Sequence, residues 1–127
     1  LLPVLGPHLA RSWGDFHGAR DLAERAPGRP PEPGGEALPA EAIAQVDALI
    51  IPALAVDRGG RRLGQGGGWY DRMLPLRRDG VGVFAMVYDD ELVSGPLPTE
   101  EHDELVDAVI TPSAWFLLKG SAFAAGS

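Results

Sequence analysis

Residues 46–72 read VDALIIPALAVDRGGRRLGQGGGWYDR, and this stretch decides the fold that the sequence predicts. It begins with an apolar run over 46–52 in which Asp47 is the only charged residue. A continuous apolar run of this length is typical of a strand that is buried on both faces of a parallel sheet. A polar turn over 57–62 and a glycine-rich loop over 64–68 follow it. The stretch therefore predicts a strand, a turn and a loop in close succession.

The rest of the chain alternates short apolar segments with helical or loop segments. Apolar spacing predicts an amphipathic helix over 69–78, which Pro75 should kink or shorten to two turns. Other expected elements are strands at 1–5, 11–16, 81–87 and 107–111, helical turns at 40–45, a proline-rich loop at 26–39 and an ambiguous apolar segment at 113–118. This alternation predicts an α/β fold. We expect one domain over residues 1–119 and a disordered tail over 120–127.

Composition excludes several classes of function. The 127 residues carry a formal net charge of −7, which disfavours nucleic acid or an anionic membrane as the main partner. There is no Cys, so disulfides, a thiolate nucleophile and thiolate-bound zinc are all excluded. The apolar runs are far too short to span a bilayer, and no signal peptide is recognisable. We expect a cytoplasmic protein that is a monomer or a weak homo-oligomer.

The glycine-rich loop at 64–68 is the best candidate for a binding site. Glycines between a strand and a helix leave backbone N–H groups free to cradle an anion, phosphate above all. Arg61, Arg62 and Arg72 would add charge, since guanidinium groups grip phosphate oxygens in pairs. A P-loop and a dinucleotide-binding fingerprint are both absent, because Trp69 stands where the last glycine of the fingerprint would be. The alternative is a flexible glycine turn with surface arginines.

The spacing of these residues resembles the signature of the 5-formyltetrahydrofolate cyclo-ligase family, also called 5,10-methenyltetrahydrofolate synthetase. The family pattern is Pro-x-Leu-Ala-Phe-Asp, a short turn, and then Arg-Leu-Gly-x-Gly-x-Gly-Tyr-Tyr-Asp-Arg. Here it stands as PALAVD at 52–57 and RLGQGGGWYDR at 62–72. Ordered supporting matches are Leu2-Pro3-Val4, Glu32-Pro33, Leu97-Pro98, His102-Asp103 and the segment 107–111. The resemblance covers residues 1–112.

The resemblance implies a three-layer, Rossmann-like α/β fold with a mainly parallel sheet. It also implies a ligase of folate one-carbon metabolism with two small-molecule substrates, 5-formyltetrahydrofolate and ATP, and Mg²⁺ as the metal cofactor. In this reaction ATP phosphorylates the formyl oxygen, N10 closes the ring, and 5,10-methenyltetrahydrofolate, ADP and phosphate result. Positioning and charge neutralisation serve such a transfer better than a protein nucleophile does.

The resemblance also implies roles for individual residues. Arg62 and Tyr70 would be catalytic, and Asp71 and Asp107 would ligate Mg²⁺, an ion that takes oxygen ligands and often only one or two carboxylates. Trp13, Glu32 and Tyr70 would contact the folate substrate. The ATP site would consist of Arg62, Leu63, Gly64, Gln65, Gly66, Gly67, Gly68, Trp69 and Tyr70.

Plainer interpretations compete with several of these roles. Asp71 could be an acidic residue that the helix dipole favours in the first turn, and Asp107 a residue at a strand end. Trp13 could belong to the core instead of stacking on a pterin. The acidic residues over 88–107 are typical of a solvated loop, apart from Asp107.

The sequence departs from the family at its beginning. Family members carry a segment ahead of the Leu-Pro-Val strand, with a basic helix that touches ATP and an acidic residue that touches folate. The chain begins after these positions, so we expect a fragment of the family fold that is nearly inactive alone. The alternatives are a nucleotide-binding α/β module without folate chemistry and a structural domain whose glycine loop is only a turn.

Overall fold

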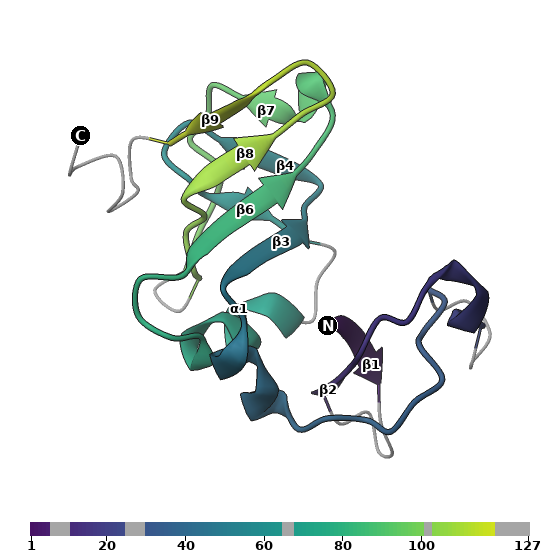
Figure 1. Cartoon of the computed structure of the whole chain (residues 1–127). Helices are drawn as coiled ribbons and strands as arrows, with labels where there is room; N and C mark the ends of the chain where they lie inside the picture. Colours follow the sequence, from purple (N-terminus) through teal and green to yellow (C-terminus); the bar gives the residue numbers. More distant parts are fainter. Residues whose placement is uncertain (6–10, 25–29, 65–67, 101–102, 119–127) are drawn as a thin grey trace. The chain divides into compact units, whose positions relative to one another are not determined.

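The computed structural model describes residues 1–5, 11–24, 30–64, 68–100 and 103–118 (Figure 1). Its contacts divide the chain into two compact units, Leu1–Gln45 and Val46–Ser127. Each unit is described by itself below. The single domain expected over 1–119 stays a prediction, and the tail expected over 120–127 lies outside the described residues.

The first unit is built on a two-stranded antiparallel sheet. Strand β1 (Leu2–Leu5) pairs with β2 (Arg11–Gly14), and both lie within the segments 1–5 and 11–16 that the sequence predicted as strands. Trp13 in β2 exchanges backbone hydrogen bonds with Leu38, which brings the proline-rich segment against the sheet. The described part of the unit also contains the short 3₁₀ helices η2 (Ala19–Asp21) and η3 (Ala40–Gln45). The helical turns expected at 40–45 are therefore confirmed.

The second unit contains a four-stranded sheet in the order β3, β6, β8, β9 (Figure 1). The first three strands run parallel and β9 is antiparallel to β8. Their bounds are Ala48–Pro52 for β3, Gly82–Met86 for β6, Ala108–Ile110 for β8 and Trp115–Leu117 for β9. Three strands lie where the sequence predicted them, and the ambiguous segment 113–118 contains the fourth.

One face of this sheet is buried and the other is exposed. Alternation along the strands places Leu49, Ile51, Val83, Ala85 and Val109 on the buried face. The opposite face, here called the outer face, carries Ile50, Phe84, Met86, Trp115 and Leu117. Ile50 is 61% exposed and Met86 53% exposed. The expectation that the 46–52 strand is buried on both faces was therefore wrong.

A second, three-stranded sheet lies in the same unit, in the order β5, β4, β7. Strand β4 (Ala55–Asp57) is antiparallel to β5 (Arg62–Leu63) and parallel to β7 (Leu92–Val93). The sequence reasoning missed these strands because they have only two or three residues each. Strands β4 and β5 nevertheless flank the predicted turn and lead the chain into the glycine loop.

The helical elements of the second unit are short. Helix α1 (Trp69–Met73) continues into the 3₁₀ helix η4 (Leu74–Leu76), and Pro75 lies where the geometry changes. This is the shortening that Pro75 was expected to cause. A third turn, η5 (Asp89–Glu91), follows β6. Within the described residues no helix is long and apolar enough to cross a membrane.

These elements make a mixed α/β fold, as the sequence predicted. Met73 and Leu74 are almost fully buried, as are the apolar side chains on the inner face of the four-stranded sheet. The core of the second unit is formed by these side chains together with the fully buried Val56 of β4 and Val106. Asp57 and Arg62 lie at the ends of the strands that this core supports.

Candidate active site

A buried ion pair joins the two ends of the glycine loop. Arg62 precedes the loop in β5, and Asp71 follows it in α1. The guanidinium Nη2 of Arg62 donates to Oδ1 of Asp71 at 2.7 Å, and their side chains are only 5% and 17% exposed. A short charge-assisted hydrogen bond of this kind fixes both side chains. The pair therefore closes the loop at its base.

A second nitrogen of the Arg62 guanidinium, Nε, is also buried. In the part of the chain that the structure describes, this nitrogen makes no hydrogen bond. The guanidinium carbon also lies 5.8 Å from the centre of the Tyr70 ring, within cation–π range. A buried donor without an acceptor is unfavourable unless water or a ligand supplies one. Arg62 is thus suited to an anionic ligand.

The start of α1 is shaped by a glycine. Gly68 lies in the left-handed region with φ +63°, and its carbonyl accepts a hydrogen bond from the N–H of Arg72. Trp69 and Tyr70 follow and pack edge to face with ring centres 4.9 Å apart. Because α1 has five residues, its macrodipole adds little to an anion site. The dipole support that the sequence suggested is therefore smaller than expected.

Burial raises the pKa of the Tyr70 hydroxyl, and the positive charge of Arg62 partly offsets this effect. Tyr70 is consequently neutral at physiological pH, and its hydroxyl can donate a hydrogen bond. Of the other residues predicted to bind ATP, the structure describes Leu63 and Gly64 as follows. Leu63 is 41% exposed in β5, and Gly64 lies so close to Arg62 that an added Cβ would be 3.1 Å from Nη1. Residues 65–67 of the predicted ATP site lie outside the described residues.

The two predicted metal ligands, Asp71 and Asp107, both accept hydrogen bonds from backbone N–H groups. Asp71 Oδ1 accepts a second hydrogen bond from the N–H of Glu104 at 3.1 Å. Asp107, which directly precedes β8, accepts with Oδ2 a hydrogen bond from the N–H of Val83 in β6 at 2.9 Å. Both carboxylates therefore have structural partners. Across the described ranges no group of three or more His, Cys, Asp or Glu side chains could hold a metal ion.

The turn between β4 and β5, residues 57–61, is here called the Asp57 turn. Asp57 is 1% exposed, and its Oδ1 accepts from the N–H groups of Gly59 and Arg61 at 2.9 Å each. Its Oδ2 accepts from the N–H of Leu97 at 2.8 Å and lies 3.5 Å from Nη1 of Arg61. Burial alone would raise the pKa of Asp57, but these donors outweigh it and hold the pKa below its ordinary value.

Asp57 is the last residue of the PALAVD stretch in the family signature, and the sequence predicted no role for it. The signal that could have found it is an acidic residue directly before Arg58-Gly59-Gly60, because aspartate commonly accepts hydrogen bonds from the backbone of a following turn. Its distant partner, Leu97, carries no such signal.

The two folate candidates, Trp13 and Glu32, belong to the first unit. Trp13 is 5% exposed, and its indole N–H donates to the carbonyl of Ala40 at 3.1 Å. Glu32 is 7% exposed, and its backbone pairs with Ala23 in an isolated bridge. The burial of Trp13 fits the core interpretation better than a free stacking surface. Both substrate roles stay predictions.

A hollow of about 560 Å³ lies at the carboxyl ends of β3, β6 and β8. Its walls include Ala53, Val87, Tyr88, Ile110 and Thr111. Ligands of parallel sheets commonly bind at this edge. None of the residues predicted to be catalytic, to bind ATP or folate, or to ligate a metal is among its lining residues, although Ala53, Ile110 and Thr111 belong to stretches that carry the family resemblance.

Comparison with known proteins agrees with the geometry around the loop. The sequence model of the 5-formyltetrahydrofolate cyclo-ligase family matches residues 1–112, which is most of the chain. The chain belongs to this family. The family match includes the Asp57 turn, the Arg62–Asp71 pair and the segment 103–107.

Relatives with the cyclo-ligase name come from distant organisms. The 5-formyltetrahydrofolate cyclo-ligase of Mycolicibacterium smegmatis is 43% identical over 118 residues, which cover 88% of this chain and 59% of that protein. The enzyme of Escherichia coli K12 is 43% identical over 75 residues, covering 56% of this chain and 39% of its own length. The NMR structure of Aquifex aeolicus 5,10-methenyltetrahydrofolate synthetase matches with a TM-score of 0.70 at 29% identity, over 92% of this chain and 57% of that one. The chain thus spans less than two thirds of the length of these relatives.

Proposed function

We propose that the chain carries the nucleotide side of a 5-formyltetrahydrofolate cyclo-ligase. The whole protein would use ATP to convert 5-formyltetrahydrofolate into 5,10-methenyltetrahydrofolate, ADP and phosphate. The observation that carries the proposal is the buried Arg62 at the base of the glycine loop, paired to Asp71 and with a buried Nε that has no acceptor among the described residues. The family match over 1–112 supports the choice of reaction.

In this proposal the phosphates of ATP lie along Gly64–Gly68, with Leu63, Gln65, Gly66, Gly67 and Trp69 as neighbours. Arg62 would donate Nε–H to a phosphate oxygen and neutralise charge as the phosphoryl group moves to the formyl oxygen of the folate. Tyr70, neutral because burial raises its pKa, would donate a hydrogen bond at the substrate edge. N10 of the folate would then close the ring as phosphate leaves. Phosphoryl transfer of this kind depends on positioning and charge.

We propose that Mg²⁺ binds the carboxylates of Asp71 and Asp107, which the family resemblance assigns to it. In the described chain, both hydrogen bonds that Asp71 accepts fall on Oδ1, and the segment 103–107 that carries Asp107 also contacts Asp71. Mg²⁺ commonly takes one or two carboxylates and completes its shell with water and phosphate oxygens. When bound, the ion would neutralise charge on the phosphates. Asp71 would then orient Arg62 and hold the ion through different oxygens.

The same proposal includes the layer arrangement of the whole protein, the residues on the folate side, the cellular compartment and the oligomeric state. We expect a three-layer, Rossmann-like arrangement with a mainly parallel sheet in the whole protein, because three of the four strands in the larger sheet are parallel. Trp13 and Glu32 remain the candidates for the folate side. We expect a cytoplasmic monomer or weak homo-oligomer without nucleic acid or membrane as partner, although one relative, from Arabidopsis thaliana, is named as mitochondrial.

The first test measures binding of MgATP to the 127-residue chain by titration calorimetry. Wild type should bind, R62M should lose binding, and R78M should keep it, because Arg78 is an exposed arginine that pairs with Asp47 instead. Equal binding by wild type and R62M would contradict the assignment of Arg62. If folded wild type does not bind MgATP, the result would contradict a phosphate-binding role for the glycine loop and would favour the alternative in which the loop is only a turn.

The second test follows the absorbance of methenyltetrahydrofolate after MgATP and 5-formyltetrahydrofolate are mixed with the chain. Because the chain spans 59% of the M. smegmatis relative, we expect little turnover from it, and that relative is the positive control. ATP binding with no turnover in any longer form of the protein would favour the alternative, a nucleotide-binding module without folate chemistry.

A further inference from the structure

The Asp57 carboxylate connects segments of chain that are far apart in sequence. Through Oδ1 it holds the Asp57 turn, and through Oδ2 it holds Leu97, forty residues further along. The turn is also closed by a hydrogen bond from the N–H of Asp57 to the carbonyl of Arg61 at 2.9 Å. Arg62 is the next residue. Its guanidinium lies close to Gly64 at the start of the glycine loop, so we expect a shift of the turn to be passed through the backbone to Arg62.

Two glycines allow this close packing. Gly95 has φ +70°, and a Cβ added to it would lie 2.5 Å from the Cβ of Asp57. Gly60 has φ +90°, and a Cβ there would lie 2.5 Å from the carbonyl oxygen of Val106. The carbonyl of Gly60 also accepts the N–H of Val106 at 2.9 Å, one residue before Asp107. The Asp57 turn thus links the Leu97 segment to the segment that carries Asp107.

We propose that Asp57 is a positioning residue that couples the Gly95–Leu97 segment to Arg62 and so determines how tightly the glycine loop binds the phosphates of ATP. This inference rests on the proposed function for its ligand. Asp57 itself does not touch the ligand in this arrangement. All of the described hydrogen bonds of its carboxylate come from backbone N–H groups, and the contact of the carboxylate with the Arg61 guanidinium is longer, at 3.5 Å.

The variant D57N separates this role from simple electrostatics. Asn keeps an oxygen for Gly59 and Arg61, but its amide nitrogen is a donor and would face the Leu97 N–H. The substitution also removes a negative charge near Arg61 and Arg62, so electrostatics alone predicts tighter binding of an anion. If Asp57 instead positions Arg62, D57N should bind the anion more weakly. We expect D57N to bind MgATP about 10-fold or more weakly, the scale seen when residues that orient a ligand-binding side chain are changed.

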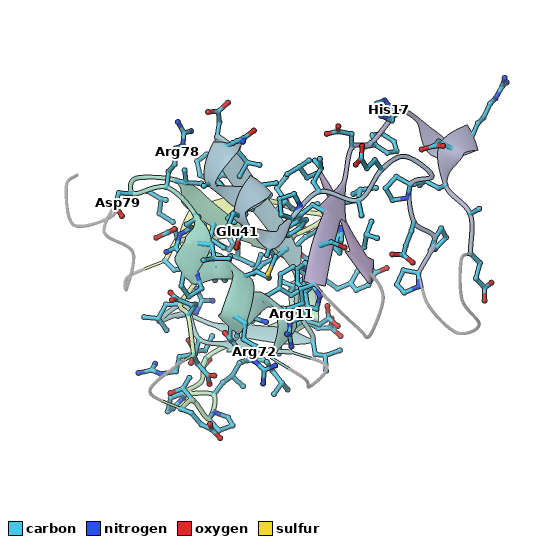
Figure 2. All side chains as sticks on the ribbon, turned by 90° about the horizontal axis from the view of Figure 1, so that it is seen from below. Arg11, His17, Glu41, Arg72, Arg78 and Asp79 are labelled. Carbon is cyan, nitrogen blue, oxygen red and sulfur yellow. The ribbon has the colours of Figure 1, made fainter. Side chains whose placement is uncertain are left out.

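A pair of glycine variants provides a matched comparison. G95A places a methyl group against Asp57 without changing any charge, and it should weaken MgATP binding as D57N does. G80A has the same kind of backbone strain, at φ +84°, but its added Cβ meets nothing within 4 Å. G80A should therefore bind MgATP like wild type. D79N, at an exposed acidic residue on the surface (Figure 2), is the control for loss of one negative charge.

Amide hydrogen exchange supplies a readout that does not need ATP. In D57N and G95A, exchange should accelerate together at Gly95 and Leu97 and at residues 59–64, while G80A and D79N leave both segments unchanged. Faster exchange at 95–97 alone would overturn the coupling, and so would unchanged or tighter MgATP binding by D57N. If wild type binds no MgATP, the proposed function fails, whereas the exchange data still decide whether Asp57 couples the two segments.

Discussion

The Asp57 turn and the outer face of the four-stranded sheet differ in burial. The Asp57 carboxylate of the turn is buried and hydrogen-bonded, whereas large apolar side chains of the outer face are exposed. In the turn, one carboxylate at 1% exposure accepts three backbone N–H groups. On the outer face, large apolar side chains such as Ile50 and Trp115 are 61% and 62% exposed. The first region is held by directional contacts, so single atoms matter there. The second contributes little burial, so single side chains matter little to the stability of this chain.

The largest effect is expected for D57A. Alanine would leave the N–H groups of Gly59, Arg61 and Leu97 buried without their acceptor. Each such group costs about 1–3 kcal/mol, so we expect the free energy of unfolding to fall by about 3 kcal/mol or more. Urea denaturation measures this loss. A loss below about 1 kcal/mol would show that water replaces the carboxylate and that the turn is less strictly held than its contacts indicate.

A somewhat smaller effect is expected for R62M. The substitution removes one partner of a buried pair and leaves Asp71 with the N–H of Glu104. Because Asp71 is 17% exposed and water can reach it, we expect a loss of about 2–3 kcal/mol, below the range for fully buried pairs. The double variant R62M/D71L should recover most of this stability, since apolar replacement of a buried pair is often neutral. Chemical denaturation of wild type, R62M and R62M/D71L measures these differences in unfolding free energy.

Nucleotide binding distinguishes the two roles of the Arg62–Asp71 pair. The double variant should fold well and yet fail to bind MgATP, because the guanidinium that faces the loop is gone. If the double variant binds MgATP as wild type does, the pair is purely structural.

The sequence located the strands better than it located their partners. The apolar run at 46–52 predicted β3 correctly, but a run without polar residues cannot reveal that Ile50 and Ile51 point to different environments. The roles of Arg62 and Asp71 could be suggested from the family resemblance. Their direct ion pair could not, because it depends on the path of a loop between them. The bond from Leu97 to Asp57 spans forty residues and follows only from the fold.

Acid should weaken the Asp57 turn more than the outer face. Three N–H groups hold the pKa of Asp57 below its ordinary value of 3.8 despite burial. Its stabilising contribution is therefore fully present above pH 4 and is lost as the pH falls through the lower, folded-state pKa. The difference in unfolding free energy between wild type and D57N should shrink below about pH 4, as urea titrations at several pH values can show. A difference that is constant from pH 7 to 3 would contradict this linkage.

The smallest effect is expected on the outer face, where one strand offers a matched pair of substitutions. I51T introduces a hydroxyl at a side chain that is 2% exposed and should lower the unfolding free energy by about 2 kcal/mol or more. I50T makes the same substitution one residue away, at a side chain that is 61% exposed. It should change the unfolding free energy by less than about 0.5 kcal/mol. Urea denaturation compares the two, and sedimentation velocity reports whether I50T reduces self-association. If I50T is as destabilising as I51T, the outer face is covered in solution, and the contrast between the two regions no longer holds.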